Sequence, residues 1–171
     1  MLQQSYKGEN KMKIIENGTV TSPKGYLGAG EHVGIKKAKK DLALIYSKVD
    51  AKAVGTFTQN IVKAAPVLWD KMIVDNYDHV RIIAVNSGVA NACTGDEGLK
   101  CNEEFAQTVA DNFGLEKEEV LICSTGVIGK QLPMNKIING VPIVKPLLSE
   151  SQEAGVIVAE SIMTTDTKPK H

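Results

Sequence analysis

The sequence has no apolar run near the roughly 20 residues that cross a bilayer. Its N-terminus also lacks a charged segment followed by an apolar core. Neither charge is in excess, because 20 basic residues balance 20 acidic ones. A global field that would gather nucleic acid or an anionic membrane is therefore excluded. These absences predict a protein that is neither secreted nor anchored, with the cytoplasm as its location.

Cysteine is scarce as well. Cys93, Cys101 and Cys123 are odd in number and lack the paired close spacing of a zinc or redox site, which predicts free thiols in a reducing compartment. We expect no metal and no tightly bound cofactor. A thiol near the start of a helix, as at Cys93, can be nucleophilic. No histidine lies in a Cys/His motif, however, so a buried structural thiol is the favoured interpretation.

The 171 residues are 43% hydrophobic, which is enough to bury the core of one domain. Residues 1–11 are polar and without period, so we expect a disordered extension there and the folded domain over residues 12–171. A short basic run is expected to be a solvated turn, and its members are Lys36, Lys37, Lys39 and Lys40.

Apolar runs alternate with glycine-containing turns and predict both strands and helices. The predicted strands are residues 14–15, 26–35, 42–47, 53–57, 80–85 and 120–123. The predicted helices are residues 64–73, 97–113, 134–138 and 149–163. Gly114 is placed as the stop signal of the clearest helix. This order predicts an α/β fold and leaves the strand order open.

A loop of small and polar residues, Asn86–Gly95, follows one predicted strand and precedes the clearest helix. Backbone N–H groups in such a position can face a ligand. Asn86, Asn91 and Thr94 supply hydrogen-bonding groups and are candidate site residues. The alternative is a compact structural turn in which the asparagine side chains are bonded internally.

A second loop, Ser124–Gly129, also follows a strand. The Thr125 hydroxyl and the Gly126 N–H are adjacent donors, and donors aimed at one point can stabilise an oxyanion. The loop has no P-loop lysine and no GxGxxG pattern, which argues against a standard nucleotide site.

Several short motifs occur in an order that resembles the ornithine acetyltransferase family, also called the bifunctional glutamate N-acetyltransferase family. They are Gly18–Thr21 with Pro23–Gly25, Phe57–Asn60, Lys63–Pro66, Asn86–Gly95, Ser124–Gly129, Leu132–Met134 with Lys136, and Ile162–Thr167. Each motif is weak by itself, but their order and separation are specific.

The resemblance implies a layered α/β sandwich that is incomplete without a second chain. In this family the precursor cleaves itself, and the new N-terminal threonine of the second (β) chain attacks the acetyl group of N-acetylornithine. Glutamate then takes the acetyl group, in arginine biosynthesis, and some members accept acetyl-CoA as the donor. The two chains assemble as a heterotetramer, and no cofactor is implied.

Carried over by motif, Thr125 and Gly126 resemble the family's oxyanion hole, and Thr164 resembles its substrate-contacting threonine. Val89 stands where the family usually has an asparagine, and a β-branched residue resists left-handed backbone geometry. The sequence stops at His171, before the family's glycine-rich lysine segment and its cleavage-site threonine. We therefore expect the 171-residue polypeptide alone to lack acetyltransferase activity.

Two other functions remain open from the residues themselves. The Asn86–Gly95 loop at a helix start could bind a phosphate group or a nucleotide without catalysis. Alternatively, the chain is a structural subunit in which both loops only pack.

Overall fold

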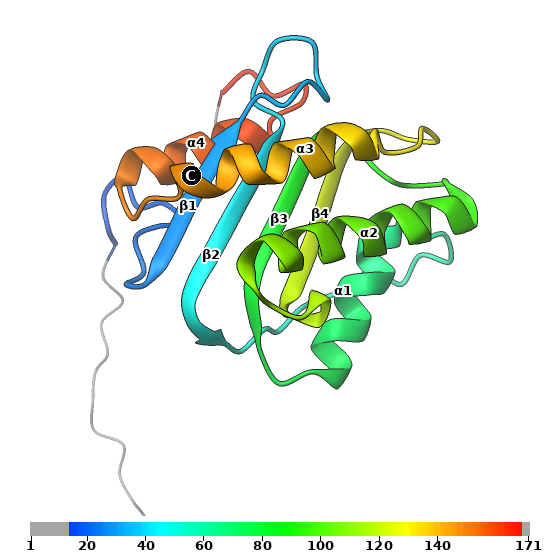
Figure 1. Cartoon of the computed structure of the whole chain (residues 1–171), viewed down its shortest axis with the longest axis horizontal. Helices are drawn as coiled ribbons and strands as arrows, with labels where there is room; N and C mark the ends of the chain where they lie inside the picture. Colours follow the sequence, from blue (N-terminus) through cyan, green and yellow to red (C-terminus); the bar gives the residue numbers. More distant parts are fainter. Residues whose placement is uncertain (1–13, 169–171) are drawn as a thin grey trace, which may run out of the picture.

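Figure 1 shows the computed structural model of the chain, which describes residues 14–168. Four strands form one sheet in the order β1-β2-β3-β4, namely β1 (Tyr26–Glu31), β2 (Leu42–Ala51), β3 (Val80–Val89) and β4 (Val120–Val127). The pairs β1–β2 and β2–β3 are antiparallel, whereas β3 and β4 are parallel. The extension predicted for residues 1–11 lies outside the described residues.

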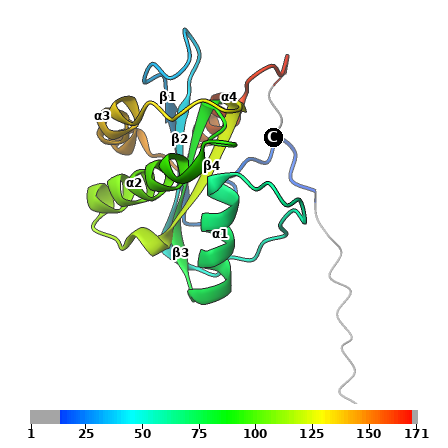
Figure 2. The same ribbon diagram turned by 90° about the vertical axis from the view of Figure 1, so that its right-hand side faces the viewer.

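Helices lie on both faces of this sheet and along one edge (Figures 1 and 2). They are α1 (Ala65–Asn76), α2 (Gly95–Phe113), α3 (Met134–Val144) and α4 (Gln152–Ile162), with short 3-10 turns at η1 (Lys117–Glu119) and η2 (Lys145–Leu147). Side chains of α2 and α3 pack on one face and those of α4 on the other. The predicted α/β class is confirmed.

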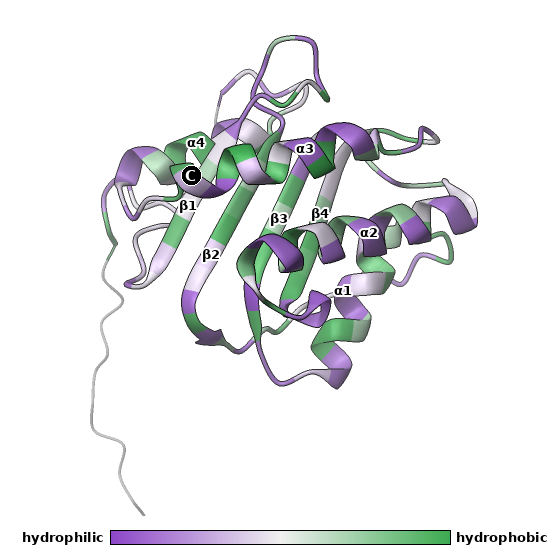
Figure 3. Cartoon of the chain, in the orientation of Figure 1, coloured by the Kyte–Doolittle hydropathy of each residue, from purple (hydrophilic) through white to green (hydrophobic). Residues whose placement is uncertain are grey.

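Alternation along the strands divides the core between these two layers, since successive side chains point to opposite faces. Figure 3 shows the apolar character of the strands. The larger cluster, beneath α2 and α3, includes Leu42, Leu44, Ile82, Ala84, Val120 and Ile122. The smaller cluster beneath α4 contains Ala43, Val85 and Val158, with Ile45, Ile83 and Cys123 packed against it. In β2, in β3 up to Val85 and in β4, even-numbered positions therefore face α2 and α3, and odd-numbered positions face α4. The order is reversed in β1, where Ala29 belongs to the larger cluster and Gly28 lies against Val158 of α4.

The predicted helix over residues 97–113 is confirmed, and it begins slightly earlier, at Gly95. Phe105 and Val109 are fully buried against the sheet. Gly114 adopts left-handed geometry with φ 67° and its N–H bonds the carbonyl of Ala110, as a helix stop requires. Within residues 14–168, no helix combines the length and the apolar character that crossing a membrane requires.

Two predicted strands are wrong. They are the strands predicted over residues 14–15 and 53–57, and neither segment pairs with the sheet. The side chains of Ile14 and Val54 are accordingly 89% and 91% exposed. The strand predicted to reach residue 35 ends at Glu31. There the chain turns, because the buried Asp41 carboxylate accepts hydrogen bonds from the N–H groups of Val33 and Lys36, both at 2.7 Å.

Two consecutive side chains of α1 cover the outer edge of β4. Trp69 Nε1 donates to the Val120 carbonyl at 2.9 Å, and the Ile122 N–H donates to Asp70 Oδ1 at 2.9 Å. These bonds occupy backbone groups that a fifth strand would otherwise use. Burial raises the pKa of Asp70 to about 7, and the bond from Ile122 offsets only part of this effect.

Replacing Asp70 with asparagine should remove a pH-dependent loss of stability. The folded-state pKa of about 7 exceeds the ordinary 3.8, so the carboxyl stabilises the fold below about pH 4 and loses that contribution as the pH rises to 7. Asp70→Asn keeps an oxygen acceptor for Ile122 and should stabilise the protein at pH 8 by about 1–2 kcal/mol, with little effect at pH 4. Thermal unfolding across this range, compared with exposed Asp75→Asn, measures the difference. If Tm depends on pH in the same way in Asp70→Asn and in the wild type, the prediction is contradicted.

Candidate functional site

A cleft of about 250 Å³ opens where β4 ends beside the C-terminal end of α4. Its lining residues are Thr125, Ala159, Ile162, Met163, Thr164, Asp166 and Lys168. Thr125 and Thr164, both predicted as site residues, thus face one space although they are far apart in the sequence. Ligands of open α/β sheets commonly bind outside the carboxyl ends of parallel strands, and this cleft has that position.

The strand alternation explains why Thr125 lines the cleft. Cys123 packs in the cluster beneath α4, and Thr125 lies two residues further along the same strand, so its side chain points to the same face. Thr164 follows the end of α4 directly above that face. Both threonines are half-buried.

The Gly126 N–H points away from the sheet. The Ile122 N–H already points to the outer edge, where it bonds Asp70, and alternate N–H groups of a strand share a direction. Gly126 lies two such steps further on, and β4 is the edge strand. Its N–H and the Thr125 side chain therefore belong to consecutive residues near the end of β4, although Gly126 itself does not line the cleft.

Gly126 has no room for a side chain beside β3. Its φ is 136°, and a Cβ atom there would overlap the carbonyl group of Gly88 on β3. Gly88 has a φ of 110° and pairs with Gly126 in the ladder. Both positions need glycine because of backbone geometry and because of space.

Two polar side chains hold the end of α4 over the sheet. Ser87 Oγ donates to the carbonyl of Ser161, and Lys36 Nζ donates to the carbonyl of Met163 at 2.8 Å. Burial lowers the pKa of Lys36, and the nearby Asp41 carboxylate opposes that shift. The prediction of a solvated turn is therefore wrong for Lys36, whose ammonium caps the helix end beside Thr164.

Asn86 is a structural link rather than a group facing the cleft. It is fully buried, its Nδ2 donates to the Val89 carbonyl at 2.9 Å, and its Oδ1 accepts from Ser124 Oγ at 2.6 Å. The residues from Asn86 to Val89 continue β3 and are not a loop, so this part of the predicted loop is corrected. The strand is longer than its apolar run because these polar side chains bond one another.

Asn91 and Thr94 likewise bond within their own turn. Asn91 is buried and donates to the Gly98 carbonyl at 2.9 Å, while Thr94 Oγ1 donates to Asn91 Oδ1 at 2.8 Å. These bonds match the alternative interpretation of this segment as a compact structural turn. They fix the start of α2.

Val89 does not adopt left-handed backbone geometry, so its β-branched side chain is not strained. It belongs to β3 and is 2% exposed, in the larger core cluster. The positive φ values fall on its neighbours, 110° at Gly88, 46° at Asn91 and 56° at Cys93.

Cys93 is exposed, which corrects the expectation of a buried thiol. It lines a separate cleft of about 350 Å³ together with Lys63, Thr94 and Asp96. The lining of this cleft contains no histidine that could serve as a general base. The three cysteines are unpaired in the structure.

With this geometry established, comparison with known proteins identifies the family. The sequence model of the ArgJ family matches residues 28–171 of the chain. The chain belongs to the ArgJ family. It is 47% identical over 156 residues to the arginine biosynthesis bifunctional protein ArgJ of Caldanaerobacter subterraneus subsp. tengcongensis, covering 91% of this chain and 38% of that protein. The ArgJ protein of Thermotoga neapolitana is 48% identical over 149 residues, covering 86% and 37%. The chain thus spans about two fifths of these relatives.

Solved structures of the same family share the fold. The crystal structure of ArgJ from Bacillus halodurans superposes with a TM-score of 0.86 at 38% identity, covering 90% of this chain and 80% of that chain. Ornithine acetyltransferase of Mycobacterium tuberculosis in complex with ornithine gives 0.87 at 40% identity, covering 91% and 83%. The resemblance inferred from the ordered motifs is confirmed, and arginine biosynthesis is the process in which this family acts.

Substituting Gly126 should destabilise the fold more than substituting a glycine in open space. Gly126→Ala places a methyl group against the Gly88 carbonyl at an unfavourable φ of 136° and should cost about 2 kcal/mol or more. Gly129→Ala is the matched control, since its φ is 73° but nothing lies within 4 Å of its Cβ position; it should cost about 1 kcal/mol. Urea unfolding measures both, and equal losses would show that the contact with Gly88 is unimportant.

Proposed function

We propose that this chain supplies the oxyanion-binding wall of an acyltransferase that moves acetyl from N-acetylornithine, or from acetyl-CoA, to glutamate. The observation that carries the proposal is the shared cleft of Thr125 and Thr164, in a member of the ArgJ family. Thr125 contributes a hydroxyl and Gly126 a backbone N–H at the outer rim of β4. Together they donate to the oxygen that becomes negative when the acetyl carbonyl is attacked.

In the proposed reaction, the hydroxyl of an N-terminal threonine on a partner β chain adds to the acetyl carbonyl. The resulting tetrahedral intermediate carries the oxyanion held by Thr125 and Gly126. The bond from carbon to nitrogen breaks, ornithine leaves with the proton, and an acetyl-threonine ester remains. The amine of glutamate then attacks the ester, and the same two donors stabilise the second oxyanion.

Thr164 is proposed to contact the substrate from the opposite wall of the cleft. Its position is fixed by the anchoring of α4, because Lys36 bonds the carbonyl directly before it. Asp166 and Lys168 line the same cleft and add one charge of each sign. This pairing suits N-acetylornithine, which carries both a carboxylate and an ammonium group. No cofactor is needed for these steps.

The proposed assembly contains the β chain and forms a heterotetramer in the cytoplasm. Half-buried apolar side chains on the sheet face beside α4 support a partner on this side. Ile45, Ile83 and Leu121 line an open cleft of about 270 Å³ on the sheet face beside α4. Apolar surface of this kind is typical of an interface.

A phosphate or nucleotide site at the start of α2 is the weaker alternative. The side chains of Asn86, Asn91 and Thr94 are engaged in internal hydrogen bonds. The first turn of α2 also carries Asp96 and Glu97, whose charges oppose an anion at that helix end. These observations favour the acyltransferase.

Removing the Thr125 hydroxyl should impair chemistry more than binding. In a pair reconstituted from this chain and the part of the Caldanaerobacter relative that it does not match, Thr125→Val should lower kcat about 10²-fold for N-acetylornithine and glutamate. Thr108→Val, on α2 and away from the cleft, is the control. Unchanged kcat in Thr125→Val, with normal activity of the control, would refute its role.

The 171-residue chain by itself should show no acetyl transfer, since it provides donors for the oxyanion but no matched nucleophile. Purified chain is incubated with N-acetylornithine and glutamate, and N-acetylglutamate is measured by mass spectrometry. Turnover that increases in proportion to the chain's concentration would contradict the need for a β chain.

A further inference from the structure

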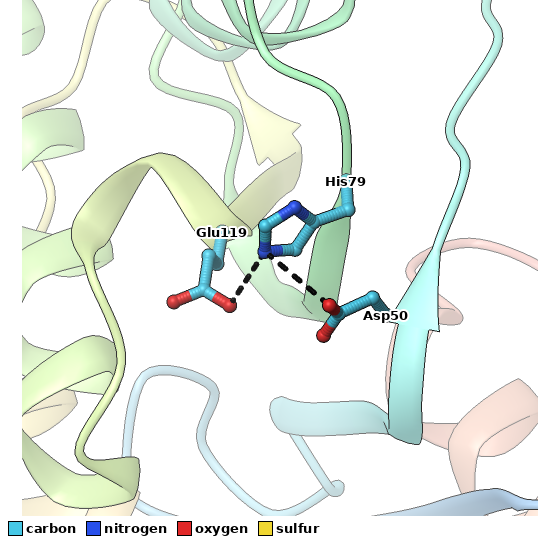
Figure 4. Close-up of side chains that lie close together, drawn as sticks. All are labelled: Asp50, His79 and Glu119. Atoms are coloured by element: carbon cyan, nitrogen blue, oxygen red, sulfur yellow. Dashed lines mark ion pairs between the residues drawn. The ribbon is translucent and has the colours of Figure 1, made fainter.

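Three potential metal ligands converge at the end of the sheet opposite the cleft (Figure 4). Asp50 lies at the end of β2, His79 directly before β3, and Glu119 in η1 before β4. Thr125 lies near the carboxyl end of β4, whereas Glu119 immediately precedes its first residue. The cluster is therefore separate from the proposed acyl-transfer site.

The donor atoms are close enough to share one ion. His79 Nε2 lies 3.3 Å from Glu119 Oε1 and 4.0 Å from Asp50 Oδ2, and all three atoms lie within 4.8 Å of one another. Ligands about 2.1 Å from zinc in a tetrahedral arrangement are separated by roughly 3.4 Å. A small inward movement of Asp50, whose side chain is 64% exposed, completes that geometry.

Each carboxylate is oriented through its other oxygen. Glu119 Oε2 accepts from the Glu116 N–H at 2.9 Å, which leaves Oε1 directed at His79. Asp50 Oδ1 lies 3.5 Å from Arg81 Nη1, which leaves Oδ2 directed at the same ring. Outer contacts of this kind hold metal ligands in position and tune their affinity.

Arg81 is held by groups outside the cluster as well as by Asp50. Its Nε donates to the Ser47 carbonyl at 2.9 Å and its Nη2 donates to the Tyr46 hydroxyl at 2.7 Å. The guanidinium is thus held against β2, behind Asp50. It contacts the Asp50 carboxylate through Oδ1, whereas Oδ2 is the oxygen nearer to His79.

A cleft of about 350 Å³ gives an ion and its water access to the cluster. His79 and Glu119 both line it, and the remaining lining residues are Asn76, Tyr77, Asp78, Glu116 and Glu118. The lining contains four carboxylates and neither lysine nor arginine. Its negative charge raises the local concentration of a divalent cation.

From these contacts we propose that Asp50, His79 and Glu119 bind a divalent transition metal, zinc in the first place, with water as the fourth ligand. One imidazole and two carboxylates form a donor set that zinc and cobalt accept. The ion would link three segments, namely the end of β2, the residue before β3, and η1. These segments are far apart in the sequence. Its function is to stabilise this end of the sheet, independently of acyl transfer.

The test uses the whole 171-residue chain, freed of metal with a chelator. Zinc binding is measured by titration calorimetry, and cobalt binding by its visible absorption. We expect one equivalent to bind, with a rise in Tm that increases with the metal concentration. His79→Gln and Glu119→Gln should each weaken binding by at least about tenfold.

Glu118→Gln is the matched control, because it removes the same charge from the same turn and the same cleft without removing a proposed ligand. It should change the affinity by less than about threefold, since only the long-range attraction is reduced. Circular dichroism of the metal-free variants verifies folding, and Asp50→Asn provides a further ligand variant if either of the first two fails to fold.

Three results would overturn the proposal. Wild-type protein that binds no stoichiometric metal would leave His79 as the centre of an ion-pair triad only. Equal losses in Glu118→Gln and Glu119→Gln would indicate diffuse attraction to an acidic surface. A thiolate charge-transfer band in the cobalt spectrum would assign the metal to a cysteine instead.

Discussion

The parallel pairing of β3 with β4 is the constraint on which the rest of the structure depends. Its register places Ser87 opposite Thr125 and Gly88 opposite Gly126, at one end of the sheet. A side chain at Gly126 would overlap the Gly88 carbonyl, so this register requires glycine there. Because Ser87 also bonds the end of α4, the same ladder that presents Thr125 locates Thr164 across the cleft.

Several residues position the lining of the cleft without lining it themselves. Asp41 is buried and bonds the N–H of Lys36, and Lys36 in turn caps the carbonyl before Thr164. Asn86 joins β3 to Ser124 on the opposite face of the sheet. A buried polar group costs stability unless its hydrogen bonds are satisfied, and these residues satisfy one another. The polar segments after the two apolar strand cores are ordered by this mutual bonding.

The sequence predicts features that are encoded locally. Gly114 and the apolar repeat determine the extent of α2, and the ordered motifs identify the family. The ends of β3 and β4 could not be predicted, because the residues beyond Val85 and Cys123 are polar and their pairing depends on contacts across strands. Lys36 resembled any surface lysine, and only the fold brings it to α4. The cluster around His79 was missed for the same reason, since its members have no recognisable spacing in the sequence.

The edge of β4 has a consequence for the protein in concentrated solution. An edge strand offers unpaired N–H and C=O groups to any other extended chain, and many proteins blunt such edges with lysine or proline. Here Trp69 and Asp70 occupy two of those groups from a single turn of α1. Protection of the first half of β4 from edge-to-edge aggregation thus depends on the packing of α1. If α1 detaches locally, the exposed edge can pair with a strand of another molecule.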